Sequence, residues 1–266
     1  MRRKYHTRTI LCLSAKGGVG KTTTAVNLAA ALQLFGRETI LVDANLTTPH
    51  VGVSLGSPVV PVTLHDVLKG KASAHEAVYL HASGLKLVPG SISYQEVKNV
   101  RHHKFADFLV DLYGQSEFLI VDASPSMGKE SLSVLKAVDE VLIITNPEMP
   151  AVTDALKAVK LCQDLGKKIL GCLVTKTNAR NPDLSLQDIQ SLLEIPLLGV
   201  IPEDRAVKFA QAKKDAVVHV HPRSAAAVQY KRLAADLLDE NYSEKIQAPG
   251  EMHILEALLR WFGWKH

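Results

Sequence analysis

The chain has 266 residues, of which 47% are hydrophobic and 22% are charged, values typical of a globular protein with one large, well-buried core. Its net charge of +4 is too small to indicate nucleic-acid binding by itself. No apolar run reaches the ~18 residues of a membrane-spanning helix. No apolar secretion signal follows the basic residues 1–6, so we expect a cytoplasmic protein.

The cysteines and histidines do not form a recognisable metal-binding or disulfide pattern. Cys12 and Cys172 lie in strand-like runs and Cys162 lies in a helix-like run, with spacings that suit neither a zinc site nor a disulfide framework. We therefore expect three buried, unreactive thiols. The histidines, among them His65, are scattered along the chain, and we interpret them as surface or packing residues.

Strand-like apolar runs alternate with helix-like runs along the chain. Most of the apolar runs are continuous, which favours parallel strands covered on both faces, and the helices between them favour right-handed βαβ units. The sequence therefore predicts an α/β fold: a doubly wound, mainly parallel sheet with helices on both faces. In such sheets ligands bind at the carboxyl ends of the strands. The predicted strands are residues 9–14, 39–43, 85–89, 118–122, 140–145, 168–175 and 197–202.

A glycine-rich loop follows the first predicted strand and leads into a helix, which is the context of a phosphate-binding loop. Glycines allow several backbone N–H groups to converge on an anion, and the helix N-terminus adds positive charge. Lys21 would contact the β- and γ-phosphates, and the Thr22 hydroxyl would bind Mg²⁺. The residues predicted to bind the nucleotide here are Lys16, Gly17, Gly18, Val19, Gly20, Lys21, Thr22 and Thr23.

The loop departs from the general phosphate-binding pattern, since Ala15 stands where the first glycine is expected. It resembles the deviant Walker A loop of the MinD/ParA family of P-loop ATPases, which carries a second lysine at its start, here Lys16. The resemblance covers essentially the whole chain. It implies ATP and Mg²⁺ as cofactors, ATP hydrolysis, and a homodimer that forms when both subunits hold ATP. It also implies that Lys16 reaches the other subunit's phosphates, as an arginine finger does.

An acid, Asp43, ends the second predicted strand and is followed by Asn45. The resemblance implies that Asp43 belongs to the family's first switch, orients the attacking water and lies at the Mg²⁺ site. Members of the family often carry a second acid two positions later, but Asn45 cannot act as a base. With Lys16 and Lys21, Asp43 completes the predicted catalytic set. The alternative is that Asp43 only caps the turn after the strand.

A second acid, Asp122, ends the apolar run at residues 118–122, which is the Walker B arrangement. Asp122 would hold Mg²⁺ through a water, together with Thr22 and Asp43. The residues after it resemble the family's second switch, although Pro125 and Gly128 are displaced from their usual spacing. An ordinary strand end is the alternative interpretation.

The nucleobase site is predicted from the resemblance alone. It implies that the residues after the last two predicted strands lie beside the adenine, with a lysine where the family has an arginine. Core strand ends explain these residues equally well. The candidates are Lys176, Asn178, Pro202 and Asp204.

The last residues of the chain form a different pattern. Residues 241–250 are polar and end in Pro-Gly, which predicts a linker between an ATPase domain at 1–240 and a helix at 251–266. At 100° per residue this helix has a wide apolar face with charged residues opposite, which suits a membrane interface. Docking on its own domain or on a partner is the alternative. The predicted membrane-contacting residues are Ile254, Leu255, Leu258, Leu259, Trp261 and Phe262.

These patterns resemble MinD-like site-determining ATPases. We expect an ATP-dependent dimer whose paired tails bind the inner face of the cell membrane by avidity, and an activating partner protein that triggers hydrolysis. Such a protein would position the division site or another cellular structure. The alternative is a ParA-like, DNA-binding partitioning ATPase; a metal-cluster carrier of the same fold has no suitably spaced cysteines. The basic candidates for DNA contact are Lys208, Lys213, Lys214, Arg223, Lys231 and Arg232.

Overall fold

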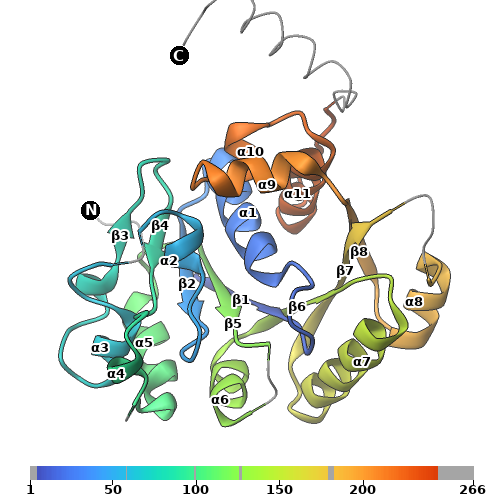
Figure 1. Ribbon diagram of the computed structural model, residues 1–266. Coiled ribbons are helices and arrows are strands. Elements are labelled where there is room, and N and C mark those ends of the chain that lie inside the picture. The colour runs from blue at the N-terminus through green and yellow to red at the C-terminus, as the bar shows by residue number, and fades with distance from the viewer. Residues whose placement is uncertain (1–4, 58, 99, 126–127, 179–182, 245–266) are drawn as a thin grey trace, which may run out of the picture.

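The computed structural model describes residues 5–57, 59–98, 100–125, 128–178 and 183–244. An eight-stranded sheet with the order β3-β4-β2-β5-β1-β6-β7-β8 runs through its centre (Figure 1). All neighbouring strands are parallel except β3 and β4. The strands are β1 Arg8–Leu13, β2 Thr39–Ala44, β3 Tyr79–Leu80, β4 Lys86–Val88, β5 Phe118–Ala123, β6 Glu140–Thr145, β7 Lys168–Thr177 and β8 Leu197–Pro202.

The predicted fold class is confirmed, and each predicted strand corresponds to one of these eight. The strand that the sequence did not reveal is β3, which pairs antiparallel with β4 at the edge of the sheet. The two are joined by a tight turn in which the Gly84 N–H donates to the His81 carbonyl at 2.8 Å. Two residues, Tyr79 and Leu80, are too short a run to show a strand period.

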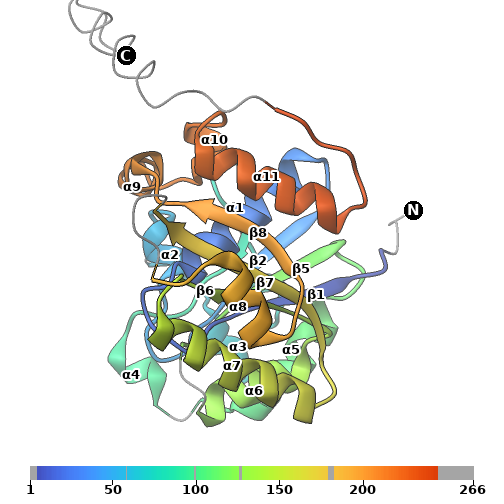
Figure 2. The same cartoon turned by 90° about the vertical axis from the view of Figure 1, so that its right-hand side faces the viewer.

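Helices cover both faces of the sheet, as Figures 1 and 2 show. Helices α3, α5, α6, α7 and α8 pack on one face, whereas α1, α2, α9, α10 and α11 pack on the other. The helices are α1 Lys21–Leu34, α2 Val51–Ser54, α3 Leu64–Leu68, α4 Tyr94–Val97, α5 Phe105–Leu112, α6 Lys129–Ala137, α7 Met149–Asp164, α8 Leu186–Leu193, α9 Arg205–Ala212, α10 Val217–Val220 and α11 Ala225–Leu237, with short 3₁₀ turns at His75–Ala77 and His102–Lys104.

Alternate residues of the central strand supply the two cores. In β1, Leu11 and Leu13 pack with the helices of one face, while Ile10 and Cys12 pack with α1 and α11 on the other. A strand buried on both faces needs apolar residues at every position, which is why the apolar runs are continuous.

Helix α1 lies between the sheet and α11, and its residues 24–32 are all buried. Ala25, Ala29, Ala30 and Ala31 present small side chains there, which lets the neighbouring backbones approach closely. Because α1 begins at the glycine-rich loop, this packing fixes the direction in which the helix N-terminus points.

The three thiols are buried, as expected. Burial raises the pKa of Cys162 to about 11 and that of Cys172 to about 12, so both stay protonated near neutral pH. Among the described residues, no helix is long and apolar enough to cross a bilayer.

The first residues after α11 contact the domain. The Tyr242 ring packs edge-on against Phe35 at 5.6 Å between centroids, and the Glu244 carboxylate pairs with Lys231. The rest of the predicted linker and the predicted helix at 251–266 lie outside the described residues, so both stay predictions.

Candidate nucleotide-binding site

The loop between β1 and α1 turns on glycines. Gly18 and Gly20 have φ values of +79° and +90°, a left-handed conformation that other residues adopt only at a cost. Gly20 is the N-cap of α1, which begins at Lys21. The free N–H groups of the first helical turn and the loop therefore lie together at the carboxyl end of β1, where an anion binds most favourably.

The end of β7 supports this loop from behind. The Thr175 hydroxyl donates to the Val19 carbonyl, and the Lys176 ammonium donates to the Gly18 carbonyl at 2.6 Å. The Val19 side chain is 2% exposed and packs in the core below the loop. The loop is thus held by both its glycines and a neighbouring strand.

A cavity of about 550 Å³ opens in front of the loop, within the size range of small-molecule sites. Its walls come from the loop, from the residues after β2, and from β7, β8, α9 and α11. It is lined by Ser14, Lys16, Gly17, Gly18, Gly20, Lys21, Thr22, Thr23, Asn45, Thr48, His50, Ser54, Pro125, Thr175, Lys176, Ile201, Pro202, Glu203, Asp204, Val207, Lys208, Gln211 and Tyr230.

Lys21, Thr22 and Asp122 meet at the bottom of the loop. The Lys21 ammonium is 2.5 Å from one oxygen of the Asp122 carboxylate, and the Thr22 hydroxyl donates to the other oxygen at 2.6 Å. Asp122 is fully buried and Lys21 nearly so. The three side chains predicted at the triphosphate and Mg²⁺ therefore lie in direct contact.

Asp43 lies next to Asp122, because the two residues are in register on the parallel strands β2 and β5. Its carboxylate accepts the N–H groups of Asn45 at 3.3 Å and Val51 at 2.8 Å. Burial, and then the charge of Asp122, raises the pKa of Asp43 to about 8. Two buried carboxyls beside a hydroxyl are oxygen ligands that Mg²⁺ prefers, so the residues present fit a Mg²⁺–nucleotide.

Asn45 has a structural task. Its side-chain oxygen accepts the Thr48 N–H at 3.1 Å and the Thr48 hydroxyl at 3.3 Å, which closes the turn after β2. An amide oxygen is sufficient for this task.

Lys16 stands at the rim of the cavity. Its ammonium pairs with the Glu148 carboxylate at 2.6 Å, and its side chain is 35% exposed. Glu148 is the N-cap residue of α7, and sequence reasoning did not single it out. Nothing in its pattern distinguishes it from other acids at helix starts.

The residues predicted at the nucleobase are divided by the structure. Pro202 and Asp204 line the main cavity, but the Asp204 carboxylate already accepts N–H groups of Ala206 and Ala226 at 2.9 and 3.0 Å. Lys176 also lines the cavity, with its ammonium at the phosphate-binding loop. Asn178 lines an adjoining hollow that it shares with Pro202 and Asp204.

Sequence reasoning missed the wall that α9 and α11 supply. Gln211 donates its side-chain N–H to the Thr23 hydroxyl at 3.1 Å, and Tyr230 lies within 3.4 Å of the Thr24 hydroxyl. Both residues belong to ordinary amphipathic helices, and their position at the cavity depends on how those helices pack on α1. The predicted membrane residues Ile254, Leu255, Leu258, Leu259, Trp261 and Phe262 lie outside the described residues.

A loop that turns on left-handed glycines into a helix, at the carboxyl edge of a parallel sheet, is the phosphate-binding arrangement of P-loop NTPases. A family model described as ParA, NUBPL iron-transfer P-loop NTPase, matches residues 6–238, and the chain belongs to this ParA family of P-loop NTPases.

Known relatives narrow the class. The chain is 33% identical to an ATP-binding protein of Methanocaldococcus jannaschii over 96% of each chain. It is 30% identical to the septum site-determining protein MinD of Neisseria meningitidis over 93% of this chain and 94% of that one. The structure of MinD from Pyrococcus horikoshii complexed with Mg-ADP superimposes with a TM-score of 0.83 at 31% identity, covering 87% of this chain and 96% of that one. The protein is thus a MinD/ParA-type ATPase, with ATP and Mg²⁺ as its cofactors.

Proposed function

We propose that this ATPase dimerises when it binds ATP, binds a membrane surface through residues 251–266, and leaves the membrane after hydrolysis. The observation that carries the proposal is the amphipathic pattern of residues 251–266, which follows the region that matches the ParA family model, residues 6–238. Two weakly binding tails brought together in a dimer bind a surface far more tightly than one tail does. Nucleotide state would thereby control membrane binding.

Within this proposal each residue at the phosphate end of the cavity has a role. The loop N–H groups and Lys21 hold the phosphates, while Thr22 and Asp122, together with Asp43, bind Mg²⁺. Mg²⁺ held there would neutralise negative charge on the phosphates. Asp43 orients the attacking water with its carboxylate, which the N–H groups of Asn45 and Val51 hold in place.

Lys16 is assigned to the partner's site. Its position at the rim and its exposure support this role, since a charge that crosses an interface has to start at the surface. Lys16 exchanges Glu148 for the phosphates of the second subunit when the dimer forms. The part of the cavity beside the nucleobase is assigned to Pro202, Asn178, Lys176 and Asp204. Asp204 shapes it through the two hydrogen bonds by which its carboxylate caps α9 and α11.

The relatives, which include septum site-determining proteins, support a cellular task for this ATPase. We assign to this protein the positioning of the division site or of another cellular structure at the inner face of the membrane. An activating partner protein that stimulates hydrolysis completes the cycle.

Vesicle co-sedimentation tests the proposal. The full chain and a chain ending at Ala248 are each mixed with phosphatidylglycerol-containing vesicles, in ADP and in a non-hydrolysable ATP analogue. We expect the ATP analogue to bring only the full chain to the vesicles. Equal sedimentation in both nucleotides, or binding of the shortened chain, contradicts the proposal.

A matched pair of full-length variants controls for truncation. Leu258→Glu puts a charge on the apolar face of the predicted helix, and His253→Glu puts the same charge on its polar face. Burying a carboxylate in the bilayer interface is unfavourable, so Leu258→Glu abolishes binding while His253→Glu preserves most of it.

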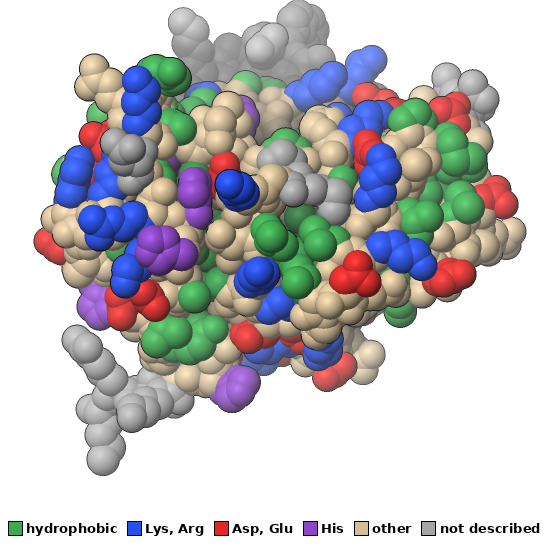
Figure 3. All heavy atoms as spheres, turned by 90° about the horizontal axis from the view of Figure 1, so that it is seen from below, with side chains coloured by type: hydrophobic (Ala, Val, Ile, Leu, Met, Phe, Trp, Pro, Cys, Tyr) green, Lys and Arg blue, Asp and Glu red, His purple; other side chains and the backbone are tan. Residues whose placement is uncertain are grey.

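The ParA-like alternative depends on a basic surface. Lys208, Lys213 and Lys214 are exposed at α9 and the turn after it, whereas Lys231 is buried and paired with Glu244. The opposite face of the molecule, seen from below in Figure 3, carries acidic side chains interspersed with basic ones. ATP-dependent DNA binding with a steep salt dependence, in the absence of vesicle binding, would favour this alternative.

A further inference from the structure

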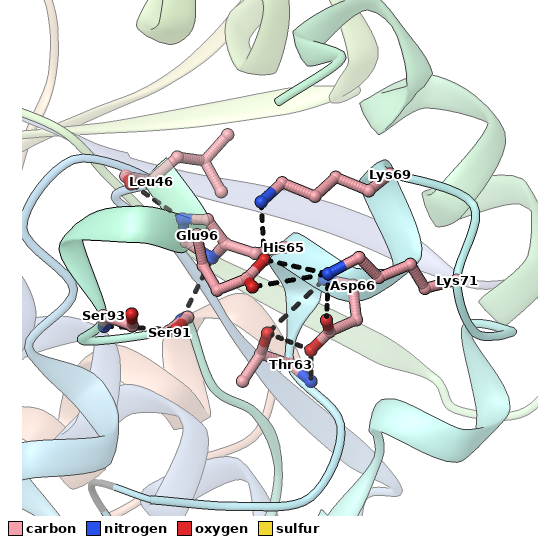
Figure 4. A network of polar contacts seen from close by, with 9 residues as sticks. All are labelled: Leu46, Thr63, His65, Asp66, Lys69, Lys71, Ser91, Ser93 and Glu96. Carbon is pink, nitrogen blue, oxygen red and sulfur yellow. Dashed lines mark hydrogen bonds and ion pairs between the residues drawn. The ribbon is translucent and has the colours of Figure 1, made fainter. Parts of the chain in front are cut away.

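Both backbone polar groups of Leu46, in the loop after β2, are bound by side chains from distant parts of the chain. The Leu46 N–H donates to one oxygen of the Glu130 carboxylate at 2.5 Å. The Leu46 carbonyl is 2.8 Å from Nε2 of His65, as Figure 4 shows. The Leu46 side chain is itself 1% exposed. We call this arrangement of His65, Leu46 and Glu130 the Leu46 clamp.

The His65 side of the clamp is held by several hydrogen bonds. Its Nδ1 accepts the Ser91 N–H at 3.0 Å, so the ring proton resides on Nε2, which donates to Leu46. Helix α3, which carries His65, is held by reciprocal hydrogen bonds between Thr63 and Asp66 at its start. The Leu64 N–H also donates to the Pro89 carbonyl at 2.9 Å, beyond the end of β4.

The Glu130 side connects two loops. Glu130 lies in the first turn of α6, shortly after the loop that follows Asp122. Its second carboxylate oxygen accepts the Thr47 hydroxyl at 2.7 Å. One carboxylate therefore joins the loop after β2 to the helix that begins after β5, and these two segments follow the strand ends that carry Asp43 and Asp122.

The clamp acts on the loop that orients Asp43. The Asp43 carboxylate accepts the N–H groups of Asn45, directly before Leu46, and of Val51, at the start of α2. A shift of Leu46 moves the Asn45 N–H and so changes the donors around the carboxylate. Because hydrolysis is sensitive to displacements of about 1 Å at the reacting groups, such a shift slows the chemical step more than it weakens nucleotide binding.

We propose that His65 and Glu130 are positioning residues for ATP hydrolysis, which act by holding Leu46 and through it the loop that orients Asp43. This inference rests on the role proposed above for Asp43. It goes further by assigning two residues outside the cavity to the reaction.

Two substitutions at His65 separate its two hydrogen bonds. In His65→Gln the amide N–H lies near the position of Nε2 and can donate to Leu46. In His65→Asn the side-chain oxygen lies near the position of Nδ1 and can accept from Ser91, but the donor to Leu46 is lost. With the full-length chain, we expect His65→Asn to lower kcat about tenfold with little change in KM or in the Kd of a fluorescent ADP. His65→Gln keeps kcat within about threefold.

The Glu130 arm uses Glu130→Ala, with Lys129→Ala in the same helical turn as the control. Glu130→Ala lowers kcat about tenfold, and Lys129→Ala leaves it unchanged. Thr47→Val, at an exposed position, removes one of the two bonds to Glu130 without touching the core and lowers kcat about threefold. This variant tests the proposal even if the others fold poorly.

The double variant His65→Asn/Glu130→Ala tests whether both residues act through Leu46. Residues that act through one intermediary are not additive, so the combined loss is smaller than the product of the single losses. Multiplicative losses, equal kcat for His65→Gln and His65→Asn, or a rise in KM alone overturn the proposal. If Asp43→Asn hydrolyses ATP normally, the role of Asp43 fails; if Asp43→Asn is inactive and the clamp variants are normal, only the clamp fails.

Discussion

The loop after β1 and the loop after β2 both end at the carboxyl edge of the sheet and both line the cavity, but they are held in different ways. The first turns on its own left-handed glycines and leads directly into α1. The second is held at Leu46 by His65, 19 residues away, and by Glu130, 84 residues away. The first loop therefore takes its shape from its own glycines, with added support from Thr175 and Lys176 of β7, whereas the second responds to changes in α3 and α6 that never touch the nucleotide.

The largest effect is expected at the first loop, from Lys21→Ala. Removing the buried ammonium takes away a cation from the phosphates and leaves the Asp122 carboxylate without its cationic partner, so kcat/KM falls by about 10³. Steady-state ATP hydrolysis measures this. Lys71→Ala, at a side chain that is 54% exposed, is the control. Comparable activity of Lys21→Ala and Lys71→Ala would contradict this prediction, because the loop after β1 would then bind the phosphates without the Lys21 ammonium.

Asp43→Asn is expected to have the next largest effect. The amide keeps the shape of the side chain but cannot accept a proton from water, so kcat falls by about 10², while ATP remains bound. Single-turnover hydrolysis and binding of a fluorescent ATP analogue separate the two effects. Asp107→Asn makes the same chemical change at an exposed position of α5. Loss of ATP binding instead of hydrolysis would contradict the role of Asp43.

A methyl group added at Gly90 tests how the second loop, the one after β2, depends on its surroundings. A Cβ there would lie 2.6 Å from the Pro49 Cβ and 3.5 Å from Cε1 of His65, so Gly90→Ala displaces the second loop. We expect a loss of about 1–3 kcal/mol in the free energy of unfolding and a lower kcat, with ADP affinity unchanged. Thermal unfolding and nucleotide titration measure the two. Gly70→Asn, at a left-handed position with open space, should be close to neutral.

The smallest effect is a pH dependence. Burial lowers the pKa of His65 below its ordinary value of 6.5, with opposing effects from the bond to Leu46 and the charges of Asp66 and Glu130, and a further lowering by Lys69. Near pH 6.5 the His65 ring therefore becomes protonated in the unfolded chain but stays neutral in the folded chain. The contribution of His65 to the free energy of unfolding is fully present above pH 6.5. It is lost as the pH falls toward the pKa of the folded state, by at most about 1.4 kcal/mol per pH unit.

His65→Gln removes this dependence. Urea unfolding of wild type and variant between pH 5 and pH 7 isolates the contribution of His65 as the difference between their slopes. If the free energy of unfolding changes with pH by the same slope in wild type and variant, the His65 ring is not held neutral in the folded chain.

The same contrast explains what the sequence could predict. The strands and the loop after β1 depend on neighbouring residues, so continuous apolar runs and the spacing of Gly18, Gly20 and Lys21 were sufficient. The edge strand β3 was not predicted, because two residues are too few to show the alternating pattern of a strand. Glu130 looked like any acid in a first helical turn, and its contact with Leu46 arises only when the start of α6 lies beside the loop after β2.

The base side was predicted from resemblance alone. Lys176 was expected beside the adenine, and its ammonium lies at the Gly18 carbonyl. Asp204 was expected beside the base, and its carboxylate caps two helices. Such contacts depend on backbone positions in elements far apart in the sequence, which no local pattern encodes.

The contacts of Tyr242 with Phe35 and of Glu244 with Lys231 limit how far residues 251–266 can extend from the ATPase domain. They fasten the chain to the domain surface up to residue 244, so the tether to residue 251 is only seven Cα steps long. Fully extended, seven steps span roughly 25 Å. Any surface that residues 251–266 bind has to come within that distance of Glu244, which brings the ATPase domain close to the surface and restricts how freely it can tumble there.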